Sequence, residues 1–124
     1  MDFDSLSQAG SMLGSGGVIV MNINTCMVSV LKRISKFYMH ESCGQCTPCR
    51  EGSGWVYRLV TKIVNGQGTT DDLQQFERVA KNIEGRTICV FGEAIAWPVA
   101  GMLRHFRKEF EYYVQHGRSM VEVV

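Results

Sequence analysis

Three cysteines stand within seven residues of this chain, and their spacing constrains the possible fold more than any other feature. Cys43, Cys46 and Cys49 form a C-x2-C-x2-C run inside ESCGQCTPCREG, residues 41–52. Thiols spaced this closely are typical of a site that binds a metal ion or an inorganic cluster. The fold must therefore hold these side chains together and bring a fourth ligand to them.

Three kinds of site are compatible with the run. A thioredoxin-like redox pair uses two cysteines after a strand, whereas a helical pattern precedes this run and Cys49 would have no role. A structural zinc site normally has two C-x2-C pairs, or one pair with two histidines, so zinc is the alternative in which His40 or Cys89 completes the set. An iron–sulfur cluster uses the whole run and takes one further thiolate from elsewhere.

The fourth thiolate must come from Cys26 or Cys89, because no cysteine follows closely after Cys49. Cys26 lies at the start of the first predicted helix, roughly two dozen Å from its other end at about 1.5 Å per residue. Cys89 lies in a predicted loop between the third and fourth helices, which in an up-down bundle returns to the end with the thiol run. We therefore expect Cys43, Cys46, Cys49 and Cys89 to bind a 4Fe–4S cluster.

Residues around the run suit an electron carrier. Gly44 permits close approach of the backbone, amides of the loop can donate to sulfur, and Pro48 stiffens the chain. Arg50 and Arg86 would offset part of the negative charge of a cluster held by four thiolates, which favours its reduced state. Both arginines also fit an ordinary solvated surface.

Apolar residues recur at helical spacing in four segments, which predicts a mainly α fold, a four-helix bundle. The first helix is expected from an N-cap at Asn24 or Thr25 to about His40. The cysteine loop follows, and apolar residues in 55–63 mark a second helix that ends at NGQG, residues 65–68.

The third and fourth helices follow the same rules. Thr69 or Thr70 is expected to cap the third, and Gly85 to end it. Pro98 suits the first turn of the fourth helix, where its missing N–H has no cost. The inward face expected for this helix consists of Met102, Leu103, Phe106, Phe110 and Val114.

Glycines precede a short apolar run near the start of the chain. GSMLGSGGVIVM, residues 10–21, predicts a turn that leads into a buried strand at 18–21. A dinucleotide loop needs a strand before its glycines and a helix after them, so this segment does not match that fingerprint.

Charge and composition exclude several functions. Lys and Arg number 13 against 12 Asp and Glu, so no basic face points to a nucleic-acid partner. Residues 5–31 carry no charge, but polar residues and glycines interrupt them, which argues against a membrane span. The acidic start, MDFD, is unlike a secretory signal. Five cysteines, an odd number, favour metal-ligating thiols in a reducing compartment over disulfides.

Several separated motifs resemble the C-terminal part of the NADH-binding flavoprotein subunit (the 51 kDa or F type) of respiratory complex I, an NADH:quinone oxidoreductase. They are ESCGQCTPCREG at 41–52, IEGRTIC at 83–89 and AWPVAGMLRHF at 96–106. AGSMLGSGGVIVM at 9–21 resembles the stretch that precedes the cluster domain of that protein. The motifs keep their order and cover nearly the whole chain.

The resemblance implies a function in electron transport. In that family a C-terminal helical bundle binds a 4Fe–4S cluster through three clustered cysteines and a distant fourth, which here are Cys43, Cys46, Cys49 and Cys89. The cluster takes electrons from FMN reduced by NADH and passes them toward quinone in the respiratory chain. Related subunits serve NAD-linked hydrogenases and formate dehydrogenases, so the cluster motif alone leaves these alternatives open.

The resemblance also implies a domain layout and partners. Residues 1–24 would end an incomplete ubiquitin-like (SLBB-type) domain, 25–117 would form the cluster domain, and 118–124 a tail. The FMN and NADH sites would lie ahead of these residues, so we expect a fragment that does not oxidise NADH alone. Expected partners are the 24 kDa-type and large iron–sulfur subunits, at the cytoplasmic face of a bacterial inner membrane or the matrix face in mitochondria.

Overall fold

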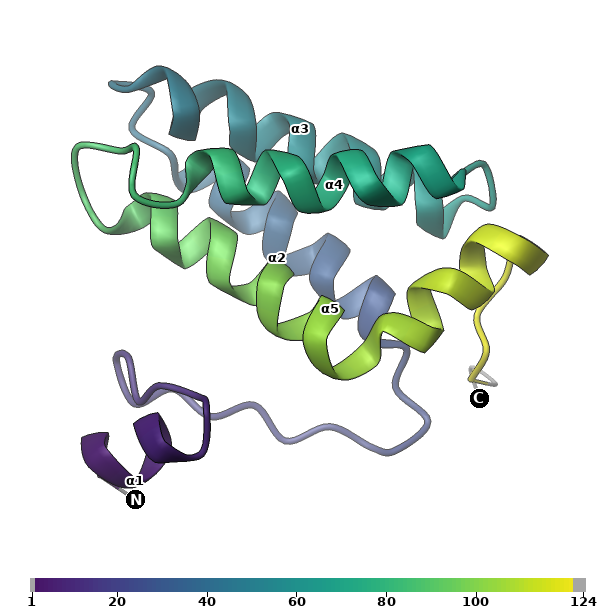
Figure 1. The fold of residues 1–124 in the computed structure, drawn as a ribbon, viewed down its shortest axis with the longest axis horizontal. Helices are drawn as coiled ribbons and strands as arrows, with labels where there is room; N and C mark the ends of the chain where they lie inside the picture. Colours follow the sequence, from purple (N-terminus) through teal and green to yellow (C-terminus); the bar gives the residue numbers. More distant parts are fainter. Residues whose placement is uncertain (1, 122–124) are drawn as a thin grey trace.

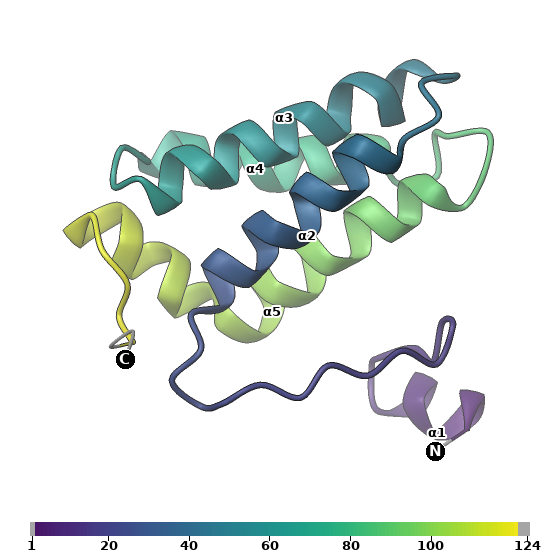
Figure 2. The ribbon, with the colours of Figure 1, turned by 180° about the vertical axis from the view of Figure 1, so that it is seen from behind.

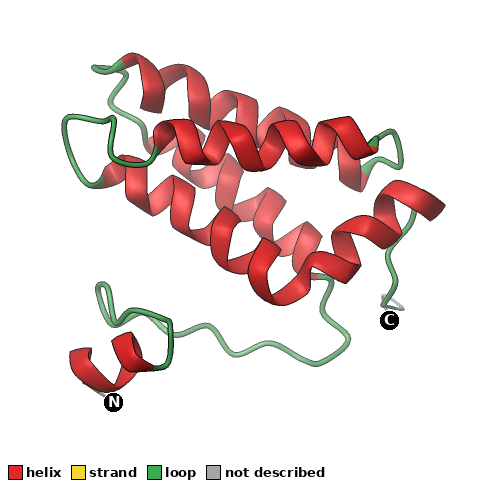
Figure 3. Ribbon diagram, viewed as in Figure 1, coloured by secondary structure: helices red, strands yellow, loops and turns green. Residues whose placement is uncertain are grey.

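The computed structural model describes residues 2–121, and these form helices without any strand (Figure 3). The helices are α1 Phe3–Gln8, α2 Met27–Glu41, α3 Thr47–Val64, α4 Thr70–Ile83 and α5 Phe91–His116. Helices α2 to α5 pack as a bundle in which α2 and α4 lie diagonally opposite, each between α3 and α5 (Figure 1). The predicted four-helix bundle is confirmed, whereas α1, which contacts no other described helix, was not predicted.

The core lies between these four helices and is built from the apolar stripes of each. Two phenylalanines at its centre, Phe76 of α4 and Phe110 of α5, are fully buried, with ring centroids 6.3 Å apart. Aliphatic side chains from α2, α3 and α4 complete the core: Val28, Leu31, Val56, Val60, Ile63 and Ile83. Burial of these side chains is the main source of the bundle's stability.

The strand expected at residues 18–21 is not confirmed. These residues have no regular secondary structure, and Val18, Ile19 and Val20 are 65%, 72% and 91% exposed. A strand needs a neighbour that shares its backbone hydrogen bonds, and the described residues 2–121 offer none. That residues 1–24 belong to a ubiquitin-like domain stays a prediction.

Helices α2 and α3 begin at residues other than those predicted. Helix α2 is capped by Cys26, whose Sγ accepts a hydrogen bond from the Ser29 amide, and not by Asn24 or Thr25. Helix α3 begins at Thr47, inside the expected cysteine loop, because a proline in its first turn favours the helical backbone. The predicted stop after residue 64 is confirmed.

Helix α5 differs most from its prediction. Pro98 lies well inside the helix, because the earlier turns bury Gly92, Ile95 and Ala96 and so offset the hydrogen bond that proline cannot make. The helix bends instead at Phe106, whose φ of −126° is not helical, and its C-terminal part turns toward the α3–α4 loop (Figure 1). The Phe106 side chain is consequently 37% exposed, although its spacing predicted a core position.

The N-terminus of α4 confirms Thr69 as its cap. The Thr69 hydroxyl accepts from the Asp72 amide, and the Asp72 carboxylate accepts from the Thr69 amide at 2.8 Å, which is a capping box. Lys62 of α3 adds an ion pair to Asp72 at 2.8 Å. Burial raises the pKa of Asp72, but the hydrogen bonds from Lys62 and Thr69 outweigh it and hold the pKa below its ordinary value.

Replacing Asp72 by alanine is expected to lower the free energy of unfolding by about 1 kcal/mol at neutral pH, because the carboxylate no longer accepts from the Thr69 amide or pairs with Lys62. A carboxyl with a depressed folded-state pKa stabilises the fold above its unfolded pKa of about 3.9 and loses this effect as the pH falls through the folded value. Urea unfolding from pH 7 to pH 2 measures both effects. Asp71→Ala, at an exposed position, is the control; an equal loss for both variants would contradict the prediction.

Candidate metal centre

Four of the five thiols lie at one end of the bundle. The α2–α3 loop carries Cys43 and Cys46, the first turn of α3 carries Cys49, and the α4–α5 loop carries Cys89. Figures 1 and 2 show these two loops at the same end, opposite to the α3–α4 loop. The up-down path of the chain therefore brings the predicted distant thiol to the end that holds the run.

Cys49 is the buried member of this group, with 5% of its surface exposed. Burial raises the pKa of the Cys49 thiol, and a hydrogen bond with Ser42 counteracts this effect only in part. The thiols of Cys46, Cys43 and Cys89 are near enough that their charges raise the pKa further. Each of the other three sulfurs thus lies within electrostatic reach of the Cys49 sulfur.

The four thiol side chains are not arranged around one common point in this structure. Among residues 2–121, no three His, Cys, Asp or Glu side chains are close enough to hold a metal ion. Cys43 and Cys89 are exposed and Cys46 is half-buried, so three of the four thiols lie at the surface of the bundle. The donor set still fits an iron–sulfur cluster, since four unpaired thiols are the ligands that a 4Fe–4S core takes.

Cys26 lies at the opposite end of α2, whose 15 residues span about 22 Å at 1.5 Å per residue. Its thiol donates to the Tyr113 hydroxyl at 3.7 Å and accepts from the Ser29 amide at 3.4 Å. Burial raises the pKa of Cys26, but hydrogen bonds with Ser29, Ser119 and Tyr113 outweigh it and lower the pKa. Cys26 therefore serves as a helix cap and a core residue.

Arg50 organises the first thiol loop. Its guanidinium donates to the Gly44 carbonyl at 3.0 Å and contacts the Thr47 hydroxyl at 3.4 Å. Gly44 has φ +77°, in the left-handed region that glycine adopts without strain. Its amide donates to the Ser42 hydroxyl at 3.4 Å rather than to a sulfur. The sequence suggested Arg50 as a countercharge, and the structure adds that it holds the loop closed.

Two acidic side chains attach the second thiol loop to α5. The Glu93 carboxylate accepts from the Gly85 amide at 2.8 Å, and the Trp97 indole donates to Glu84 at 2.8 Å. Both contacts join residues at the end of α4 to the first turns of α5. Trp97 is consequently 42% exposed beside the loop and does not fill the core. Sequence reasoning did not identify Glu84, because only the fold brings it to Trp97.

In the rest of the α4–α5 loop, the Thr87 side chain packs closely against Gly92. The Thr87 hydroxyl donates to the Cys89 carbonyl at 2.7 Å, and a Cβ on Gly92 would overlap that hydroxyl oxygen. Only glycine fits at this position without moving the loop. Arg86 donates to the Lys81 carbonyl at 3.1 Å, so it caps the end of α4.

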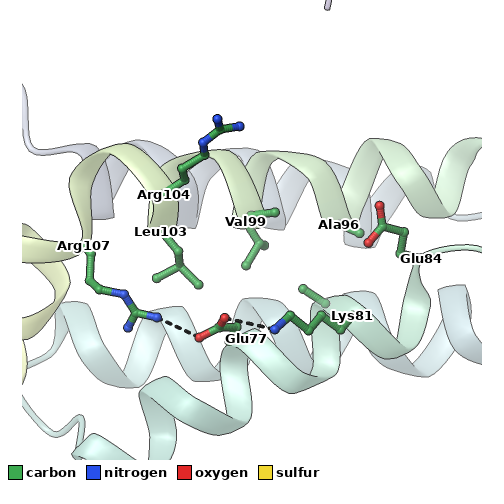
Figure 4. A pocket seen from close by; sticks show the side chains of 10 residues that line it. Glu77, Lys81, Glu84, Ala96, Val99, Leu103, Arg104 and Arg107 are labelled. Carbon is green, nitrogen blue, oxygen red and sulfur yellow. Dashed lines mark hydrogen bonds and ion pairs between the residues drawn. The ribbon is translucent and has the colours of Figure 1, made fainter. Parts of the chain in front are cut away.

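A separate cleft lies between α4 and α5 (Figure 4). Its floor is apolar, with Val99 and Leu103, and its rim is charged. Glu77 accepts from Lys81 at 3.2 Å and from Arg107 at 2.9 Å, so one carboxylate is shared by two cations. No cysteine lines this cleft, which leaves the thiol end as the candidate metal centre.

The helices of the described residues include none that is long and apolar enough to cross a bilayer. Residues 5–31 carry no charged side chain. Helix α1 and the irregular segment after it occupy most of that stretch.

A helical bundle with four free thiols at one end has the architecture of a cluster-binding domain. Comparison with known proteins identifies the family of this domain. Residues 29–113 match the family model NADH_4Fe-4S, described as the NADH-ubiquinone oxidoreductase-F iron-sulfur binding region. The chain belongs to this family. The resemblance inferred from the motifs is confirmed, and so is the assignment of a 4Fe–4S cluster as the cofactor of the region.

Curated relatives agree with the family match. The F subunit of the NADH-quinone oxidoreductase of Rickettsia bellii is 54% identical over 115 residues, which is 93% of this chain and 28% of that protein. Its counterpart in Rickettsia rickettsii is 56% identical over 111 residues, 90% of this chain and 26% of that protein. The chain thus spans little more than a quarter of the relatives that it matches.

A solved structure has the same fold. A chain of an NAD+-reducing [NiFe]-hydrogenase in its H2-reduced state superposes with a TM-score of 0.74 at 31% sequence identity. The match covers 78% of this chain and 17% of the hydrogenase chain. The bundle is therefore shared with a related class of oxidoreductase.

Proposed function

We propose that this chain is the electron-transfer module of an NADH:quinone oxidoreductase flavoprotein and that Cys43, Cys46, Cys49 and Cys89 hold its 4Fe–4S cluster. The observation that carries the proposal is the gathering of four unpaired thiols at one end of a bundle whose residues 29–113 match the iron–sulfur family. When bound, such a cluster accepts and releases single electrons.

The residues of this chain hold and insulate the site. Cys49 is anchored in the first turn of α3 and buried against the core, so one ligand has a fixed position. The other three thiols lie on loops tied to the helices through Arg50, Glu84 and Glu93, whose contacts limit how far these loops can move. The helices behind Cys49 exclude water from one side, which strengthens every charge interaction there.

We place this module in a larger enzyme. Electrons would come from FMN reduced by NADH and continue toward quinone, with the FMN and NADH sites outside residues 1–124. The identity of 54% to the quinone-linked protein of Rickettsia bellii exceeds the 31% to the hydrogenase chain, which favours the quinone-linked enzyme over an NAD-linked hydrogenase. The expected partners are the 24 kDa-type and large iron–sulfur subunits, on the cytoplasmic or matrix side of the membrane.

Anaerobic reconstitution tests this function. The chain is incubated with iron and sulfide, desalted, and assayed for both elements and for visible absorption, with a parallel incubation in zinc. We expect a brown protein with about four iron and about four sulfide per chain. A colourless protein that retains one zinc and no sulfide would contradict the proposal and favour a zinc-stabilised interaction module.

A further inference from the structure

Ser42 links the end of one helix to the start of the next at the thiol site. It is the C-cap of α2, where its amide donates to the Tyr38 carbonyl at 3.1 Å. Its hydroxyl oxygen lies 3.1 Å from the Cys49 sulfur. The backbone of Ser42 is thus anchored by α2, and its side chain reaches the buried thiol of α3.

While Cys49 is a thiol, either atom of this pair can be the donor, so the protonation state of Cys49 decides the direction. The Gly44 amide donates to the Ser42 oxygen at 3.4 Å, which occupies an acceptor position of the hydroxyl and leaves its hydrogen for another partner. A ligating cysteine is a thiolate and has no hydrogen to give. Once Cys49 is deprotonated, only the Ser42 hydroxyl can donate in this contact.

Burial makes this hydrogen bond stronger than the same contact at the protein surface. Cys49 is 5% exposed, so few water molecules compete for its sulfur. A hydrogen bond to an ionised acceptor is stronger than a neutral one, and a low local dielectric strengthens it further. Donors to cluster sulfurs stabilise the more negative, reduced state and so raise the reduction potential.

We infer that Ser42 is a positioning residue that donates a hydrogen bond to the Cys49 sulfur and raises the reduction potential of the bound cluster. The inference rests on the proposed function, because it needs Cys49 as a ligand. Ser42 itself binds no iron. Its effect is on the ease with which the site accepts an electron.

The test is the midpoint potential of reconstituted protein, followed by electron paramagnetic resonance during a redox titration. Ser42→Ala is expected to lower the potential by up to about 59 mV, a tenfold change in the equilibrium constant of a one-electron couple. Ser42→Thr keeps a hydroxyl and should stay near the wild-type value. Ser53→Ala is the matched control, because Ser53 is a buried serine of α3 whose hydroxyl donates to the Arg50 carbonyl at 3.4 Å.

Iron and sulfide content, measured on every sample, separates the two proposals. A Ser42→Ala protein with full iron and sulfide but an unchanged potential overturns the inference and leaves the proposed function intact. A wild-type chain that takes up no cluster overturns the proposed function. Ser42→Gly, which also lacks the hydroxyl and suits a helix C-terminus, is titrated if the alanine variant does not load. If both variants lose the cluster, Ser42 assembles the site without tuning it, and the inference is wrong.

Discussion

Replacing Cys89 by serine is expected to remove most of the iron and sulfide that the reconstituted chain binds. Cys89 is the only cysteine outside residues 43–49 at this end of the described bundle, and a hydroxyl is a poor ligand for iron in such a cluster. Changing even an outer partner of a metal ligand typically costs about 10–100-fold in affinity, so loss of a ligand should cost at least that. Metal and sulfide assays and visible absorption measure the result.

Cys26→Ser is the matched control, because it removes a thiol from the same chain at the opposite end of α2. We expect normal iron and sulfide content, together with a small loss of stability, because the serine hydroxyl still caps α2 but is more polar than the buried thiol that it replaces. Loss of the cluster in Cys26→Ser, together with its retention in Cys89→Ser, would reject the assignment of Cys89 as the fourth ligand. Circular dichroism of both proteins verifies that the bundle still forms.

Replacing Phe76 by alanine is expected to lower the free energy of unfolding by about 3–5 kcal/mol. The Phe76 ring is fully buried and stacks on Phe110, so its removal leaves a cavity between α4 and α5. Such a loss is a large fraction of the roughly 5–15 kcal/mol that stabilises a typical domain. Urea unfolding followed by far-ultraviolet circular dichroism measures the difference.

Phe3→Ala provides the comparison for this second prediction. The Phe3 side chain is 68% exposed on α1, which contacts no other described helix. Substitution there should change the free energy of unfolding by no more than about 0.5 kcal/mol. A loss at Phe76 as small as the loss at Phe3 would mean that the stacked pair does not lie in the core of the bundle.

Local rules explain the parts of the fold that could be read from the sequence. The period of apolar residues predicted four packed helices, and Gly66 and Gly85 lie just past the ends of α3 and α4 with φ +73° and +69°. Thr69 caps α4 because a threonine hydroxyl can satisfy a free amide of the first turn. Each of these features depends on residues within a few positions, so distant contacts did not change them.

The same local rules failed where a distant contact competed with them. Pro98 favoured a helix start, but contacts between the first turns of α5 and the end of α4 extended the helix backwards. The apolar residues 18–21 favoured a strand, but a strand cannot form without a partner. Neither outcome can be derived from the residues nearest to the feature.

The candidate site also has features that the sequence predicts and features that only the fold determines. The sequence by itself determined that thiolates form the site, since the C-x2-C-x2-C run with a remote cysteine favours an iron–sulfur cluster over zinc, and the predicted helix length separated Cys26 from the run. Only the tertiary structure decided the surroundings, including the Ser42 hydroxyl on the Cys49 sulfur and the burial of that thiol. The physical reason is that ligand spacing is set along the chain, whereas burial and hydrogen-bond partners are set by helices that meet only after folding.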